Sequence, residues 1–280
     1  MQFEYFTPAS ELQEAIGSYY QVSFSAPFED RMRAEIANVR FVLEGAVRSD
    51  LMGKWREFKA PFALLCGPTF RSSRIEFDPG TVVFGAAVTP LGWAQMAPSS
   101  AHHFADQFVD LRNTMEERFR PLIDEIFAAK TTEERLSKVD GFFAAARRTS
   151  ARIDRVFLDQ ITEWITQPGP MELEDLLETS GRSQRQLERL CKAYFGGSPK
   201  KLHRKFRALH AANAFAWDEH QDWRDVASTT YYDQAHFIRE FKTFNGRTPT
   251  EFINGPHFLV RVTLDQRRQI DHPSPYSLIG

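Results

Sequence analysis

The sequence predicts an α+β chain in which a β-rich, barrel-like N-terminal domain and a helical linker precede an all-α C-terminal domain. Short apolar or alternating runs, separated by Gly and Pro, extend to about Val109. The apolar period becomes helical from about Ala105, and a helix-rich unit recurs within residues 164–253. The expected parts are a β-rich sensor-like domain (1–110), a helical linker that could also dimerise (111–166), the helical domain (167–256) and a tail (257–280).

Length and composition limit the class of protein. The 280 residues allow two domains, and 42% hydrophobic with 26% charged residues is ordinary for a soluble globular chain. No run approaches the ~20 apolar residues of a membrane helix. The N-terminus carries acids and lacks the basic-then-apolar layout of a signal peptide. Cys66 and Cys191 are too few for a disulfide framework, so we expect a cytoplasmic protein.

The first part of the chain contains strand-like runs at 19–26, 38–48, 62–70 and 71–88. Short strands at this spacing are typical of a small barrel or sandwich. The sequence Asp78-Pro79-Gly80 between two such runs predicts a hairpin. The large aromatic side chains of this region would fill a core or line a pocket, and the core is favoured. They are Phe41, Phe58, Phe62, Phe70, Phe77, Phe84, Trp55 and Trp93.

Helical spacing follows in the middle of the chain. Apolar residues three and four apart run from Phe108 to Phe127, from Leu136 to Phe143 and from Val156 to Ile165. These stripes could pack on the barrel or form a dimer interface, and packing is slightly favoured. The sequence Gln167-Pro168-Gly169-Pro170 marks a boundary. Near the end, FLVRVTL (258–264) looks strand-like and precedes a polar, Pro-rich tail.

A duplicated unit organises the C-terminal part. Five positions recur fifty residues later: Leu187, Arg189, Lys192, Gly196 and Pro199 correspond to Phe237, Arg239, Lys242, Gly246 and Pro249. Each copy reads as a helix, a tight turn, a second helix, a Gly stop and a Pro-started helix. In the first copy Gly181 suits the turn and Ser183 suits the N-cap. This order is typical of a helix-turn-helix, whose second helix enters the DNA major groove.

The second helix of the first copy carries suitable chemistry. Between Arg182 and Arg207 there are nine Lys or Arg residues and one acid, Glu188, in a chain of net charge −2. A basic patch of this kind attracts phosphate. Polar side chains such as Gln184, Arg185, Gln186 and Arg189 can bind base edges. The alternative is a solvated charged helix face.

From about Glu172 to Phe252 the chain resembles the DNA-binding domain of the AraC/XylS transcription regulators. SGRSQRQLERLCKAYFGGSPKKLHRKFRALHAA resembles the first half of their signature, and YYDQAHFIREFKTFNGRTPTEF resembles the second half. The resemblance implies two helix-turn-helix subdomains joined by a long helix, about 200–217. It places Arg185, Glu188, Arg189, Gln234, Ala235 and Arg239 at base-facing positions. It assigns scaffold roles to Gly181, Leu187, Phe206, Phe237, Phe241 and Pro249.

The complete candidate DNA-binding set combines these base-facing positions with nearby polar and basic residues. Its members are Gln184, Arg185, Glu188, Arg189, Lys192, Lys200, Lys201, Arg204, Gln234, Ala235, His236, Arg239 and Lys242. The second copy departs from the family, because VASTTYYDQ lacks the usual turn Gly. Thr230 or Tyr231 must then take the turn, and positive φ is costly for such residues. The base-facing positions of that copy therefore depend on a remodelled turn.

The N-terminal part resembles the cupin-like sensor domains that precede AraC-type DNA-binding domains. The similar segments are GPTFRSSRIEF and VVFGAAVTPLGWAQM. The resemblance implies that this domain binds a small effector, dimerises, or does both. A regulator of this kind is also expected to act with RNA polymerase.

The alternatives to a sequence-specific regulator are an enzyme that carries the DNA-binding module and an effector-independent DNA-binding protein. Adjacent His102 and His103 point to different sides of an element, so we expect neither a metal nor another cofactor. An enzyme fused to the DNA-binding module, such as an alkyl-acceptor repair protein, would need a reactive thiol, whereas Cys66 lies in the apolar run FALLCGPTF. We therefore expect no enzyme activity. An effector-independent DNA-binding protein would differ only in its pocket.

Overall fold

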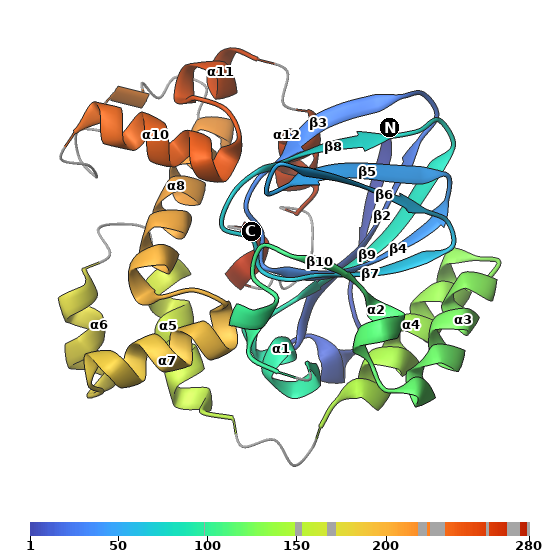
Figure 1. Cartoon of the computed structure of the whole chain (residues 1–280), viewed down its shortest axis with the longest axis horizontal. Helices are drawn as coiled ribbons and strands as arrows, with labels where there is room; N and C mark the ends of the chain where they lie inside the picture. Colours follow the sequence, from blue (N-terminus) through green and yellow to red (C-terminus); the bar gives the residue numbers. More distant parts are fainter. Residues whose placement is uncertain are drawn as a thin grey trace.

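The structure is a computed structural model that describes residues 1–97, 99–148, 153–166, 172–217, 223–224, 233–255, 258–267 and 275–278. A β-rich part on one side and a group of helices on the other confirm the predicted α+β class (Figure 1). Among the residues so described, no helix has the length and apolar character needed to cross a membrane.

Two antiparallel sheets form the β-rich part. The larger sheet has the order β1 (Gln2–Phe6), β2 (Ile16–Phe24), β9 (Thr81–Val88), β4 (Ala37–Glu44), β7 (Phe62–Cys66) and β10 (Phe108–Asp110). The smaller sheet has the order β3 (Phe28–Met32), β8 (Ser73–Phe77), β5 (Ala46–Leu51) and β6 (Lys54–Lys59). We call the two facing sheets the barrel.

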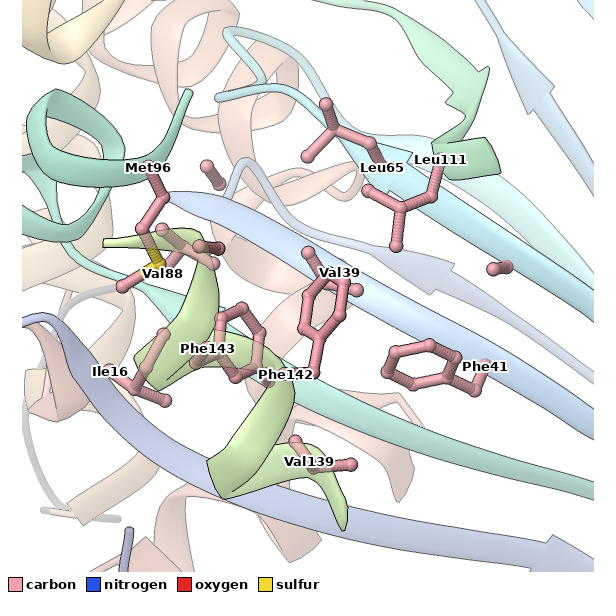
Figure 2. Close-up of a cluster of buried hydrophobic side chains, with 14 of the residues drawn as sticks. Ile16, Val39, Phe41, Leu65, Val88, Met96, Leu111, Val139, Phe142 and Phe143 are labelled. Carbon is pink, nitrogen blue, oxygen red and sulfur yellow. The ribbon is translucent and has the colours of Figure 1, made fainter. Parts of the chain in front are cut away.

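Strand β4 shows how the larger sheet covers two cores. Successive side chains of a strand point to opposite faces, and β4 is apolar on both. Val42 packs between the two sheets, whereas Val39 and Phe41 face outward. Phe142 and Phe143 from a covering helix complete that outer core (Figure 2). The predicted barrel is therefore confirmed, and most of its aromatic side chains are core.

The predicted hairpin at 78–80 is wrong, although the chain does turn there. Gly80 has φ +78°, but β8 before the turn and β9 after it belong to different sheets. Strand β8 is already paired on both edges, with β3 and β5, so it has no free edge for β9. The turn carries the chain from one sheet to the other.

Helices connect and cover the barrel. The shorter ones around it are η1 (Ser10–Leu12), α1 (Pro90–Met96), η2 (Ala101–His103), α2 (Leu111–Thr114) and η3 (Glu117–Phe119). Helices α3 (Arg120–Ala128) and α4 (Thr132–Ala146) lie against the larger sheet (Figure 1). Helix α5 (Arg155–Thr166) packs instead with the C-terminal helices, through Phe157 and Ile161.

The C-terminal helices follow the duplicated pattern. They are α6 (Leu173–Ser180), α7 (Gln184–Phe195), α8 (Pro199–Trp217), α10 (Gln234–Asn245) and α11 (Pro249–Asn254). The long α8 runs from the α6–α7 pair to the α10–α11 pair (Figure 1). It agrees closely with the helix expected at about 200–217.

The strand-like expectation for 258–264 is wrong, because these residues lie in helix α12 (Phe258–Arg267). A short run of β-branched and apolar residues fits either period, and tertiary packing decides. Here Leu259 and Val262 pack on the barrel core, while Val260 and Leu264 pack on the core beside α10. A helix turns Leu259 and Val262 toward one core and Val260 and Leu264 toward the other, so it buries both pairs. The tail ends in η4 (Pro275–Leu278).

Candidate nucleic-acid interface

Helix α7 begins and ends as its sequence predicts. Gly181 closes α6 in the left-handed conformation, with φ +61°. Ser183 and Gln186 then form a capping box, in which the Gln186 amide N–H donates to Ser183 Oγ and the Ser183 amide N–H donates to Gln186 Oε1. Because the Gln186 side chain caps its own helix, it is a poorer base-edge reader than its neighbours.

One face of α7 is buried and the other is open. Leu187 and Cys191 are fully buried against α5 and α8. Gln184, Arg185 and Arg189 are exposed on the opposite side. These side chains can make bidentate hydrogen bonds to adenine or guanine in a major groove. The predicted base-reading residues of α7 therefore lie where a duplex could reach them.

Other charged side chains near α7 have partners within the protein. Glu188 and Lys192 are half-exposed and form an ion pair at 3.9 Å. Arg182 donates from Nη2 to Asp154 Oδ2 at 2.5 Å, and its guanidinium lies over the ring of Phe157. It holds the turn against α5.

Helix α10 repeats the same design. Asp233 accepts a hydrogen bond from the Ala235 amide at 3.0 Å, and Phe237 and Phe241 are fully buried. The exposed residues of its outer face are Gln234, Ala235, Arg239 and Lys242. The turn before it, which depends on Thr230 or Tyr231, lies outside the described residues.

Helices α7 and α10 also end alike. Gly196 and Gly246 both have φ +81°, and their amide groups donate to the carbonyl oxygens of Lys192 and Lys242. Only Gly adopts this conformation without steric cost. A Pro-started helix follows each stop, capped by Ser198 before α8 and by Thr248 before α11. The duplication read from the sequence is thus repeated in the backbone.

The carboxylate of Glu240 is a buried site that the sequence reasoning missed. Its side chain is 0% exposed and accepts hydrogen bonds of 2.7 Å from Arg204 Nε and Arg207 Nη2. His236 Nε2 lies 3.5 Å from the same carboxylate. The signal was available, because Glu240 occupies the position that the apolar Leu190 holds in the first copy. An acid in an apolar slot indicates a buried ion pair.

The candidate basic residues on α8 divide by surroundings. Lys200 is exposed. Lys201 Nζ lies 3.6 Å from Asp106 Oδ2 and 4.0 Å from the centre of the Phe70 ring, both on the barrel side. Arg204 is bound to Glu240 and remains half-exposed. Lys200 is therefore the α8 residue most available to a phosphate.

The β-rich part contacts helices α7, α8 and α10. Lys205 Nζ donates to the carbonyl oxygen of Glu35 at 2.6 Å, and Arg33 Nη1 donates to Asn213 Oδ1 at 2.6 Å, both on α8. The Ala34 amide donates to the carbonyl oxygen of Phe244, at the end of α10, at 2.7 Å. His102 Nδ1 lies 3.2 Å from the Gly196 carbonyl oxygen, at the end of α7. His102 therefore belongs to a domain contact.

A second candidate site is a cavity of about 80 Å³ between the two sheets. Its walls are mainly apolar side chains of the barrel, together with Leu259 and Thr263 of α12. One end is polar: Arg40 Nη2 bonds to Glu35 Oε2 at 2.6 Å, and Arg40 Nε donates to the Tyr20 hydroxyl at 2.8 Å. Glu35 therefore lines the cavity and also accepts the hydrogen bond from Lys205 through its backbone carbonyl oxygen.

The two thiols are poor nucleophiles. Both are buried, and burial raises the pKa of Cys66 to about 11 and that of Cys191 to about 12. The reactive form of cysteine is the thiolate, which these pKa values suppress near neutral pH. This disfavours the alkyl-acceptor alternative.

Comparison with known proteins agrees with the C-terminal geometry. The family described as "Helix-turn-helix domain" matches residues 176–255. No curated protein matches the chain. Similar solved structures include ToxT from Vibrio cholerae O395 bound to (E)-4-(8-methylnaphthalen-1-yl)but-3-enoic acid, with 10% identity over 90% of this chain and 97% of that chain and a TM-score of 0.46. The AraC-like transcriptional activator CuxR has 14% identity over 71% and 77% of the two chains and a TM-score of 0.28.

Proposed function

We propose that this protein is a transcription regulator of the AraC type that reads double-stranded DNA with α7 and α10, and the match of residues 176–255 to a helix-turn-helix family supports this. One observation carries the proposal. The two helices have equal lengths and the same Gly stop, and each buries one face while exposing polar and basic side chains on the other. Such a pair suits two successive segments of a major groove.

The contacts divide into two kinds. For base edges we propose the residues near the start and middle of each helix, namely Gln184, Arg185, Glu188, Arg189, Gln234, Ala235, His236 and Arg239. For phosphates we propose the basic residues Lys192, Lys200, Lys201, Arg204 and Lys242. Base contacts carry the sequence preference, whereas phosphate contacts supply affinity that falls with salt.

Selection of bound duplexes from a random pool tests the proposal with the full chain. We expect two unlike elements about one helical turn apart. A variant with Gln184, Arg185 and Arg189 all changed to Ala should lose one element and keep the other. A variant with Gln234 and Arg239 changed to Ala should do the reverse.

The matched control is Arg118→Ala, which removes an exposed Arg beside α3, outside the double motif. It should leave both elements unchanged. Salt-sensitive binding with no enriched sequence would contradict the proposed specificity. A single enriched element that depends on α7 alone would remove α10 from base reading.

For the N-terminal part we propose an effector-binding role, supported by the cavity between the sheets. Contact with RNA polymerase and formation of a homodimer are proposals that come from the family resemblance. Co-purification with polymerase and sedimentation of the full chain test them.

A further inference from the structure

Helix α12 belongs to two cores at once. Leu259 and Thr263 form part of the wall of the barrel cavity. One position further along, Val260 and Leu264 are 4% and 0% exposed and pack into the hydrophobic cluster that contains Phe237 of α10. The same helix therefore separates the cavity from the second helix-turn-helix subdomain and touches both.

One barrel carboxylate, that of Asp30, binds both α12 and the turn between α10 and α11. Asp30 on β3 is 5% exposed, and its Oδ2 accepts a hydrogen bond of 3.0 Å from the Leu259 amide. Its other oxygen pairs with Arg247, in the turn between α10 and α11. Asp30 thus holds α12 and the second subdomain to the same strand.

The cavity is smaller than a usual ligand pocket, so a ligand can enter only if part of the cavity wall moves, and α12 is the candidate. The cavity measures about 80 Å³, whereas small-molecule pockets usually measure roughly 300–1,000 Å³. Every strand of the wall is held in a sheet by at least one ladder of hydrogen bonds, and inner strands such as β8, between β3 and β5, are held by two. Helix α12 lies across β1 and β3 and is not part of any ladder. It is the part of the wall that can move without breaking a sheet.

The polar end of the cavity favours an uncharged ligand. Arg40 is already paired with Glu35, so their charges cancel. Burial raises the pKa of Tyr20 to about 12, and it raises that of Cys66 as noted above, which keeps both groups neutral near pH 7. A buried anion would find no net positive charge there, and burying an unmatched charge is costly. A neutral hydrogen-bonding group can share the Arg40–Tyr20–Glu35 network.

We propose that the barrel cavity binds an uncharged, mainly apolar molecule with one hydrogen-bonding group, and that its entry displaces α12 together with the second helix-turn-helix subdomain. A change in DNA binding caused by this displacement rests on the proposed function, whereas the displacement of α12 does not. Filling the cavity pushes Leu259 and Thr263 outward. Because Val260 and Leu264 belong to the core around Phe237, that core must shift with the helix.

The test uses the full chain and the fluorescent amine N-phenyl-1-naphthylamine as the neutral apolar probe. Its anionic relative 1-anilinonaphthalene-8-sulfonate is the comparison. Hydrogen exchange of segments 258–267 and 237–252 is measured with and without each probe. The amine should bind more tightly than the sulfonate, and it should lower the protection of both segments while strands β4 and β9 keep theirs.

Two cavity variants and one control sharpen the result. Leu259→Ala removes a side chain from the wall, so the amine should bind about tenfold more tightly because less work is needed to open the site. Val47→Phe fills the cavity and should abolish binding of the amine. If the Phe variant does not fold, the smaller change Val47→Leu is used in its place. Val156→Ala, which removes an apolar side chain that is 67% exposed on α5, should change nothing.

Three results would overturn the inference. The first is amine binding, blocked by the filling variant, without any change in exchange of 258–267. The second is tighter binding of the sulfonate than of the amine. The third is no amine binding by either wild type or Leu259→Ala. Loss of all DNA binding would instead reject the proposed function, and the exchange measurement would still decide this inference.

Discussion

Lys205 Nζ on α8 donates a 2.6 Å hydrogen bond to the backbone carbonyl oxygen of Glu35 on the barrel. The carboxylate of Glu35 binds Arg40 at the polar end of the cavity. Glu35 therefore lines the cavity and also binds α8, the helix between the α6–α7 pair and the α10–α11 pair. The lysine is almost fully buried, and this burial lowers the pKa of its amine.

Stability should depend on pH through Lys205. Burial lowers its pKa to about 7, with Asp106 and Glu35 raising it and Lys201 and Arg33 lowering it further. In the unfolded chain a lysine has a pKa of about 10.4. Between these values the unfolded state binds more protons, so the free energy of unfolding rises with pH. Between about pH 7 and pH 10 the melting temperature of the wild type should therefore gain a contribution that Lys205→Met lacks.

The control for this prediction is Lys200→Met, which removes an exposed lysine from the same helix. Its melting temperature should follow that of the wild type across the pH range. Parallel curves for wild type and Lys205→Met would show that the buried amine does not titrate in this window.

Arg189→Ala should weaken specific DNA binding by about 1–3 kcal/mol and relax the preference at one position. The side chain is exposed on the outer face of α7, where a guanidinium can reach a guanine edge. Competition binding with the selected site and single-base variants measures both quantities. Unchanged affinity together with unchanged preference would show that this face of α7 does not enter the groove.

Two adjacent lysines should behave differently. Lys200→Ala should weaken binding to all sequences alike and reduce the slope of log affinity against log salt by about 1. Lys201→Ala also removes the contacts with Asp106 and Phe70, so it should lower the melting temperature as well. Affinities at several salt concentrations and thermal unfolding separate the two effects. Equal melting temperatures would contradict the assignment of Lys201 to the domain contact.

Glu240→Gln should destabilise the protein strongly. It would leave Arg204 and Arg207 facing a buried group that no longer carries a negative charge, and removal of one partner of a buried ion pair costs about 3–5 kcal/mol. The chemically matched control is Glu188→Gln on α7, at a half-exposed position where the cost should stay below about 1 kcal/mol. Urea unfolding of both variants provides the comparison. Similar midpoints for the two would reject the buried pair as a source of stability.

The sequence was most informative where local chemistry decides the structure. The helix stops at Gly196 and Gly246, the cap at Ser183 and the long helix α8 all follow from residues within a few positions of one another. The bounds of helices α7 and α10 and their exposed faces could therefore be predicted from the sequence. Whether the individual residues touch DNA remains a prediction.

The features that could not be predicted from the sequence depend on contacts between residues far apart in the chain. Pairing of β8 with β3 and β5 depends on strands far away in the chain, so the turn at Gly80 gave no sign of joining two sheets. Helix α12 had a strand-like pattern because its two apolar faces meet two different cores. Lys205 and Glu35 lie 170 positions apart, and nothing near either residue indicates the other.

The two Gly stops face the barrel as well as ending their helices. A Cβ atom at Gly196 would lie 2.6 Å from Pro68 Cγ, and one at Gly246 would lie 3.0 Å from Arg31 Cδ. Both ends of the duplicated unit are thus seated on the β-rich part. Under the proposed function, this seating fixes the distance between α7 and α10. Inserting about half a turn, or ~5 base pairs, between the two DNA elements should then rotate one element to the far side of the duplex, out of reach of its helix.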